Sequence, residues 1–171
     1  KSAGLETRDK AKTFIYAFLY GAGDAKIGSI AGGGAEEGKK LKENFLNNTP
    51  ALKTLRTKAG NKALKNGYLK AIDGRKIKTL SEHSSLNFLL QSAGAIIAKR
   101  AWVIFHELAT HLDYLQLGVI HDEIQIECSP DDAEEIGRLT VKAMEQTTEY
   151  YKLKCPITGE YKIGRSWNET H

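Results

Sequence analysis

The chain has few cysteines, few prolines and no long apolar run among its 171 residues. Cys128 and Cys155 lack C-x-x-C spacing, so we expect two free thiols and exclude a zinc site or a disulfide framework. No apolar run approaches the ~20 residues needed to cross a bilayer, and charged residues interrupt residues 1–20, which excludes a signal-peptide core. These deficits predict a cytoplasmic protein with no membrane partner.

Acidic residues are scarce in the first half of the chain. Residues 1–80 hold 17 Lys and Arg against 7 Asp and Glu and carry +10, whereas residues 81–171 hold 8 against 14 and carry −6. A solvated surface would explain this asymmetry. A basic half beside an acidic half also suits a polyanion track next to a metal-binding carboxylate site.

The spacing of apolar residues predicts an α+β fold in one continuous unit, without a Pro-rich linker or repeats. Thr7 and Gly21 are suitable ends for a helix over 7–21. The glycine-rich segment 21–38 lacks a G-K-[ST] ending, so it reads as a flexible turn rather than a phosphate loop. We expect further helices over 36–48, 50–67, 84–112 (opened by Ser84 or Ser85) and 129–153, hairpins over 68–80 and 119–126, and a weak strand near 161–163.

One face of the first helix carries two cations and then two phenols. Arg8, Lys12, Tyr16 and Tyr20 recur every four residues, while Phe14 and its neighbours occupy another face. Arg8 and Lys12 could hold the phosphates of a nucleotide, and Tyr16 could pack on its sugar or base. A solvated basic face accounts for Lys12 but leaves both tyrosines unexplained.

A second group of polar residues lies among apolar neighbours later in the chain. Apolar strands flank His121, Asp122 and Glu123, so the predicted hairpin turn carries two adjacent carboxylates, the ligands that Mg²⁺ prefers. Successive strand residues point in opposite directions, so we expect one acid to bind metal and the other to assist. A solvated hairpin tip, where Asp-Glu dipeptides are common, would also explain them. Asn87 and Gln91 share one face of the long helix, where backbone groups could satisfy both amides.

Together, three ordered motifs resemble those of family A DNA polymerases, the family of bacterial DNA polymerase I. They are R-x-x-x-K-x-x-x-Y-x-x-x-Y-G (8–21), L-N-x-x-L-Q-S-A-G-A (86–95) and V-x-H-D-E-I-Q (119–125). The resemblance runs from end to end and is strongest to the branch found in short-tailed bacteriophages, whose carboxy-terminal ending is similar to Trp167 and His171. It implies a fingers region over 1–83 and the carboxy-terminal part of a right-hand palm over 84–171.

The resemblance implies that the first helix closes on the incoming deoxynucleoside triphosphate. Arg8 and Lys12 match positions that contact the triphosphate, and Lys12 also matches a proton donor to the leaving pyrophosphate. Tyr16 matches a position near the sugar, where tyrosine implies tolerance of 3′-deoxy nucleotides and phenylalanine implies their rejection.

Five further positions match contacts with primer-template DNA. Tyr20 matches a residue that stacks on the template, and Arg75 matches a contact to the nucleic-acid backbone. Asn87 and Gln91 match minor-groove contacts near the primer end, where acceptors are common to every correct base pair. His121 matches a contact to the primer terminus.

Asp122 matches a catalytic metal ligand, and Glu123 matches its supporting neighbour. A two-metal Mg²⁺ site needs another bridging carboxylate, which the family carries in an upstream D-x-S-x-x-E-L-R strand. That motif is not among these 171 residues, nor are a thumb, an exonuclease and the upstream palm strands. We therefore expect a fragment, a truncation or one half of a split enzyme, inactive alone. The missing strands would leave a sheet edge and apolar surface for self-association or a partner chain.

The sequence thus predicts a DNA-directed DNA polymerase, a nucleotidyltransferase acting in the bacterial host cytoplasm if the chain is of phage origin. One alternative is a nucleic-acid-binding module without turnover, which would keep the basic half and bind duplex in a salt-sensitive manner. Another is a metal-dependent nuclease built on His121 and the two acids. The nuclease gives no role to the stripe of residues on the first helix.

Overall fold

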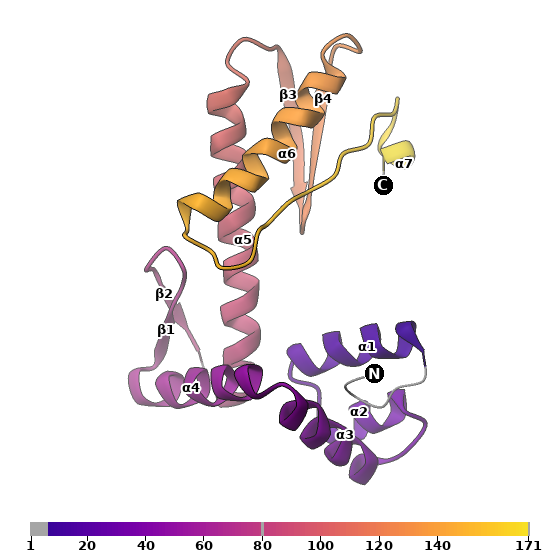
Figure 1. The fold of residues 1–171 in the computed structure, drawn as a ribbon, viewed down its shortest axis with the longest axis vertical. Helices are drawn as coiled ribbons and strands as arrows, with labels where there is room; N and C mark the ends of the chain where they lie inside the picture. The colour runs from indigo at the N-terminus through magenta and orange to yellow at the C-terminus, as the bar shows by residue number, and fades with distance from the viewer. Residues whose placement is uncertain (1–6, 80, 171) are drawn as a thin grey trace. The chain divides into compact units, whose positions relative to one another are not determined.

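The computed structural model describes residues 7–79 and 81–170. His171 therefore lies outside the described residues, as do residues 1–6 and 80. Helices and small antiparallel sheets alternate as an α+β fold, which confirms the predicted class (Figure 1). The elements are α1 (Arg8–Leu19), α2 (Asp24–Ile30), α3 (Ala35–Asn48), α4 (Pro50–Asn66), β1 (Tyr68–Lys70), β2 (Lys76–Lys78), α5 (Glu82–Leu108), β3 (Tyr114–Ile120), β4 (Glu123–Cys128), α6 (Ala133–Tyr150) and α7 (Trp167–Thr170).

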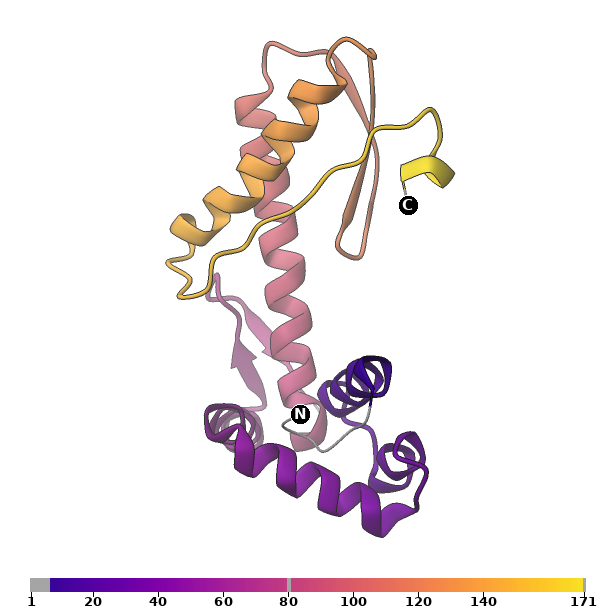
Figure 2. The same cartoon turned by 45° about the vertical axis from the view of Figure 1, so that its right-hand side comes forward.

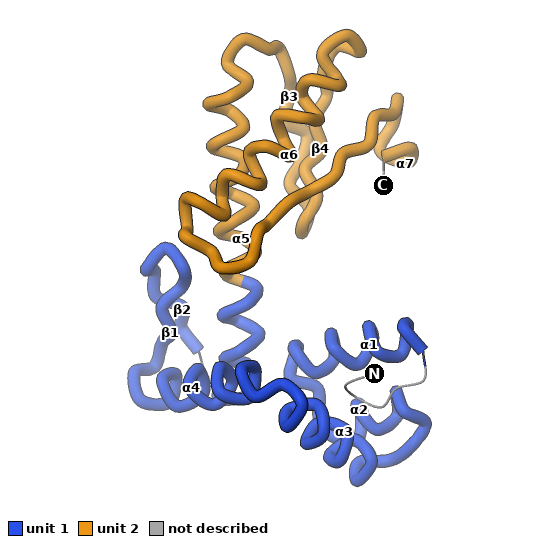
Figure 3. The backbone as a smooth tube through the Cα atoms, in the orientation of Figure 1, with its two compact units in different colours: residues 1–91 blue, residues 92–171 orange. Residues whose placement is uncertain are grey.

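The chain divides into two compact units, residues 1–91 and 92–171, with the division inside α5 (Figure 3). The predicted boundary lies at residue 83, and both that boundary and the assignment of the two parts to fingers and palm stay predictions. Both cysteines are free thiols, as expected. Helix α5 is long and apolar enough to cross a membrane by length and composition, the one such helix in the described part of the chain. Its apolar side chains also supply cores in both units, among them Leu86 and Phe105.

In the first unit, helix α1 is amphipathic and begins as its sequence predicts. The Thr7 hydroxyl accepts a hydrogen bond from the backbone N–H of Lys10, which caps the helix. Phe14 and Phe18 are buried with Ile27 and Phe45, and the rings of Phe14 and Phe45 meet edge to face with centroids 5.2 Å apart. The core therefore takes one face of α1 and leaves the other to solvent.

The prediction of a flexible turn over 21–38 is wrong, because helix α2 occupies its centre. Two glycines explain how this helix can pack against α3. A Cβ on Gly28 would clash with the backbone of Gly34, and a Cβ on Gly38 would clash with the carbonyl oxygen of Asp24. These glycines permit close helix contact rather than flexibility.

Helices α3 and α4 and the β1–β2 hairpin confirm the remaining predictions for this unit. Pro50 occupies the first turn of α4, and Gly67 ends it with a left-handed φ of 72°. Leu69 of β1 pairs with Ile77 of β2 across the Asp73-Gly74 turn and packs on the buried alanines of α4.

In the second unit, the carboxy-terminal part of α5, helix α6 and the β3–β4 hairpin lie side by side (Figure 2). Their side chains share one core. Ile104, Phe105 and Ala109 of α5 pack against Ile136 and Ala143 of α6. Partly buried side chains of both strands cover this cluster, including Tyr114, Ile126 and Cys128. The hairpin thus has a packed face, which fixes its orientation on the two helices.

Several predicted boundaries or elements differ from the structure. Helix α6 spans Ala133–Tyr150 rather than 129–153, and the second hairpin runs over 114–128 rather than 119–126. Helix α5 begins at Glu82 rather than at Ser84 or Ser85, because the Ser81 hydroxyl accepts from the backbone N–H of Ser84 and acts as the cap. It ends at Leu108 instead of residue 112. No strand forms near 161–163. Instead, Tyr161 lies against Gly137 of α6, where any side chain would clash with its ring, and its hydroxyl donates to Glu134 at 2.7 Å.

Candidate functional site

The exposed face of α1 presents the four residues predicted to bind nucleotide and template. Arg8, Lys12, Tyr16 and Tyr20 are all exposed, with 52% of Tyr16 and 55% of Tyr20 accessible to solvent. The two tyrosine rings stack at a centroid distance of 6.5 Å. Because the opposite face is anchored in the core, this stripe is held on a fixed scaffold and its aromatic surfaces remain open to a ligand.

The end of α1 contacts the start of α5 through residues of the same unit. Gly21 has a φ of 77°, and a Cβ there would lie 3.2 Å from the carbonyl oxygen of His83. One side chain completes this contact: Gln91 Nε2 donates a hydrogen bond of 2.7 Å to the Tyr20 hydroxyl. The structure thus brings together two of the predicted DNA-binding residues. Asn87 lies one turn earlier on α5 and is half-buried.

An ion pair holds the segment that follows α1. Lys42 Nζ of α3 lies 2.8 Å from Asp24 Oδ1 and donates to the carbonyl of Ala22 at 2.6 Å. The hydrogen bond from Lys42, reinforced by its positive charge, lowers the pKa of the Asp24 carboxyl. Sequence reasoning did not identify this pair, since its partners are far apart in the chain and each looks like an ordinary surface charge.

Arg75, a predicted backbone contact, lies in the β1–β2 turn. Its Nε donates to Asp73 Oδ2 at 2.6 Å, and its backbone N–H donates to Asp73 Oδ1. Partial burial raises the pKa of the Asp73 carboxyl, but the hydrogen bonds from Arg75 outweigh it and leave the pKa below its ordinary value. The Arg75 side chain is 64% exposed.

The predicted hairpin forms, but its turn contains two residues rather than three. Ile120 pairs with Glu123, so His121 and Asp122 make the turn and Glu123 is the first residue of β4. His121 has a φ of 56°, an uncommon backbone conformation for a residue other than glycine. Both turn residues are exposed, whereas Glu123 is half-buried. The two acids therefore occupy different environments, and the roles expected for them stay predictions.

Two residues without a predicted role contact Glu123. Gln125 Nε2 and Trp167 Nε1 both donate to Glu123 Oε1, the latter at 2.8 Å. Strand alternation could have identified Gln125, because residues 123 and 125 share one face of β4. Trp167 was noted for its resemblance to a family ending, and no local pattern pairs it with a residue 44 positions away.

The described residues do not form a complete metal site. Among residues 7–79 and 81–170, no group of three or more His, Cys, Asp and Glu side chains could hold a metal ion. Asp122 is an exposed hard-oxygen donor and fits the role of a single ligand. A two-metal centre would need further carboxylates from outside the described residues.

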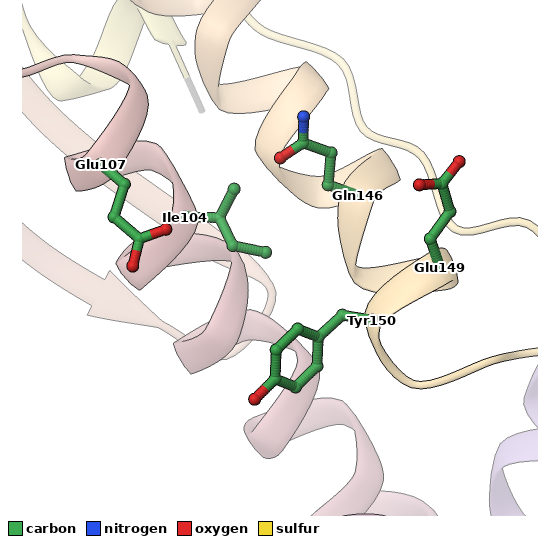
Figure 4. A pocket seen from close by; sticks show the side chains of 5 residues that line it. All are labelled: Ile104, Glu107, Gln146, Glu149 and Tyr150. Carbon is green, nitrogen blue, oxygen red and sulfur yellow. The ribbon is translucent and has the colours of Figure 1, made fainter.

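A pocket between α5 and α6 is separate from the predicted site residues. Ile104 and Glu107 line it from α5, and Gln146, Glu149 and Tyr150 line it from α6 (Figure 4). Its polar lining includes two acids, Glu107 and Glu149, and none of the predicted contacts to nucleotide, DNA or metal belongs to it. We assign it no role in the site.

Residues 1–169 match the family model described as DNA polymerase family A. Over 194 aligned residues, the chain is 41% identical to the DNA-directed DNA polymerase of Enterobacteria phage T3, covering 99% of this chain and 27% of that protein. The DNA-directed DNA polymerase of Escherichia phage Phieco32 is also 41% identical, with coverage of 100% and 29%.

A solved structure shares the fold at lower sequence identity. The POL domain of Pol1 from M. smegmatis, in complex with a DNA primer-template and dNTP, matches with a TM-score of 0.83 and 23% identity. The match covers 95% of this chain and 30% of that one. The chain thus spans less than a third of the length of the proteins that it resembles.

Proposed function

This chain belongs to DNA polymerase family A, and we propose that it supplies the nucleotide-binding face and part of the catalytic centre for template-directed DNA synthesis. The phage relatives point to replication in the cytoplasm of a bacterial host. The observation that carries the proposal is the exposed Arg8-Lys12-Tyr16 stripe on a helix whose other face is buried. A merely solvated helix would not need an exposed tyrosine pair beside two cations.

In the proposed reaction, the primer 3′-hydroxyl attacks the α-phosphate of a deoxynucleotide and pyrophosphate leaves. Arg8 and Lys12 bind the triphosphate, Arg8 as a bidentate donor and Lys12 as a point charge. Lys12 then donates a proton to the departing pyrophosphate. Tyr16 packs beside the sugar, where its hydroxyl permits a 3′-deoxy nucleotide.

The remaining predicted residues contact the primer-template DNA. Tyr20 stacks on the template base, and Gln91 can donate to a minor-groove acceptor once its amide leaves the Tyr20 hydroxyl. Asn87 contacts the same groove one helical turn away. Arg75 contacts the nucleic-acid backbone, and His121 contacts the primer end.

Family A DNA polymerases generally use Mg²⁺, and Asp122 would provide one carboxylate ligand for it. When bound, Mg²⁺ neutralises charge that develops on the phosphate oxygens. Glu123 supports the same centre from the adjacent strand position. The second bridging carboxylate would come from the remainder of the polymerase, on the same chain or on a partner chain.

The β3–β4 sheet offers a place for that remainder to bind. It has two strands, and its β3 edge carries Leu115 and Leu117, each 62% exposed, with Val119 also exposed. An unpaired edge with exposed apolar side chains favours pairing with another strand. We propose that upstream polymerase strands cover this edge. When those strands are missing, two copies of this chain associate through it.

The stripe can be tested by comparing two lysines of the same helix in a polymerase containing this chain. Replacing Lys12 with Ala removes the proposed phosphate contact and proton donor, so we expect a raised KM for dNTP and a kcat lowered about 100-fold. Lys10→Ala, on another face of α1, should leave both constants near wild type. Equal effects of the two substitutions would contradict the proposal.

A further inference from the structure

We propose that Trp167 is a positioning residue that fixes the Glu123 carboxylate beside the catalytic turn. The inference rests on the proposed function, because it takes Glu123 as part of the polymerase centre. It assigns a role to α7, whose resemblance to the family ending does not by itself explain what the helix does. All the residues involved belong to the second unit.

Several polar contacts join α7 to β4. Trp167 Nε1 donates to Glu123 Oε1 at 2.8 Å, and Gln125 Nε2 donates to the same oxygen. At the other end of α7, the Thr170 hydroxyl lies 3.4 Å from Gln125 Oε1 and 3.1 Å from the carbonyl oxygen of Trp167. Each end of the four-residue helix thus contacts one of two side chains on the same strand face.

Burial does not explain why the indole lies there. Trp167 is 51% exposed and belongs to none of the hydrophobic core clusters of the described residues. Glu123 and Gln125 are half-buried, so the polar contacts form where water is partly excluded and hydrogen bonds are stronger. The contact of the indole that bears on the catalytic turn is therefore the hydrogen bond from its N–H to Glu123.

Contacts of the segment before α7, and within its first turn, hold this helix in place independently of Trp167. Tyr161 donates to Glu134 and packs on Gly137, which fixes the preceding segment along α6. The backbone N–H of Arg165 donates to Glu169 Oε2 at 2.7 Å, closing the start of the helix. Loss of the Trp167 N–H should therefore release Glu123 without releasing α7.

Glu123 needs such restraint because it immediately follows the turn. A catalytic group must be held within about 0.5 Å of its productive position, and a free glutamate has several rotamers at the start of a strand. Two hydrogen-bond donors on one carboxylate oxygen select a single rotamer of Glu123. Outer partners of this kind typically change activity by roughly 10–100-fold when they are removed.

The test uses a polymerase that contains this chain and its upstream part. Trp167→Phe keeps an aromatic ring and removes the N–H, so we expect kcat to fall about tenfold with KM for dNTP unchanged. Replacing Trp167 with β-(3-benzothienyl)alanine, in which sulfur takes the place of the ring N–H, should give the same loss with almost unchanged shape. Thermal unfolding of each variant should match wild type.

A double-mutant cycle separates positioning from a general structural role. In a Glu123→Gln background, Trp167→Phe should cause no further loss, because the carboxylate that it positions has already been replaced. An equal tenfold loss in both backgrounds, or full activity of the benzothienyl variant, would overturn the inference.

The Asp122→Ala variant shows whether a negative result refutes only the positioning role of Trp167 or the proposed polymerase function as a whole. If that substitution abolishes extension while Trp167→Phe has no effect, only the role of Trp167 is refuted. If extension survives Asp122→Ala, the proposed centre is refuted and the positioning role falls with it.

Discussion

Tyr16 and Tyr20 are exposed aromatic residues whose positions the core does not require. Their partners lie outside the core: the two rings stack on each other, and Tyr20 accepts from Gln91. The sequence predicted this stripe because a period of four residues places its members on one helix face. It could not predict the Gln91 contact, which depends on where α5 meets α1.

The sugar-side role of Tyr16 leads to a prediction about substrate discrimination. Tyr16→Phe removes the hydroxyl that the account places near the missing 3′-OH of a 3′-deoxy nucleotide, so we expect such nucleotides to be used at least about tenfold less efficiently relative to dNTP. Competitive single-nucleotide incorporation measures this ratio. Tyr20→Phe should leave the ratio unchanged, and a similar shift in both variants would contradict the assignment.

The Asp24–Lys42 pair leads to a prediction about pH. Because the pKa of Asp24 is lowered in the folded chain, its stabilising contribution is fully present above its ordinary value of 3.8 and is lost as the pH falls through the folded pKa. Asp24→Asn should therefore lower the thermal midpoint at pH 6, and the difference should shrink below pH 3.8. A difference that is constant with pH would show that the charge is not involved.

At the scale of elements, glycine contacts between α2 and α3 decide the packing of the nucleotide-binding unit. Gly28→Ala places a methyl group into the backbone of Gly34, so we expect a loss of unfolding free energy of about 1–3 kcal/mol or more. Chemical denaturation measures it. Gly94→Ala is the matched control, because apart from the adjacent backbone of α5 no described atom lies within 4 Å of its Cβ position. It should stabilise by about 0.4–1 kcal/mol.

Most elements could be predicted from the sequence because their signals are local. Thr7, Pro50 and Gly67 mark helix ends through capping and φ preferences, and the Asp73-Gly74 turn defines its own hairpin. The failures are non-local. The segment around Gly28 was predicted to be a flexible turn, because its packing partner in α3 is not adjacent in sequence. Residues 161–163 were predicted to form a strand, although Tyr161 packs on a helix.

For the candidate site, too, local features could be predicted from the sequence and contacts between distant segments could not. Its residue types and their order could be predicted, including the hairpin that carries His121 and Asp122. The contacts of Glu123 with Trp167, and of Asp24 with Lys42, join segments that are distant in sequence. Only the folded chain brings those partners together, so sequence patterns could not assign them.

At the scale of the whole molecule, the exposed β3 edge predicts association of the isolated chain. Leu115→Lys combined with Leu117→Lys places charges on that edge and should convert self-associated chain to monomer. Sedimentation at increasing concentration measures this change. Leu64→Lys, at an exposed position of α4, should leave the association unchanged. A wild-type chain that stays monomeric at all concentrations would contradict the prediction.

The central claim is that Asp122 belongs to a polymerase centre completed by residues outside this chain. Primer extension in Mg²⁺ tests it most directly, with the 171 residues joined to, or mixed with, the upstream part of a family A polymerase. We expect extension with the wild-type chain, its loss by a factor of at least about 1,000 in Asp122→Ala, and full activity in Asp131→Ala, an exposed acid outside the turn. Normal extension by Asp122→Ala would contradict the account.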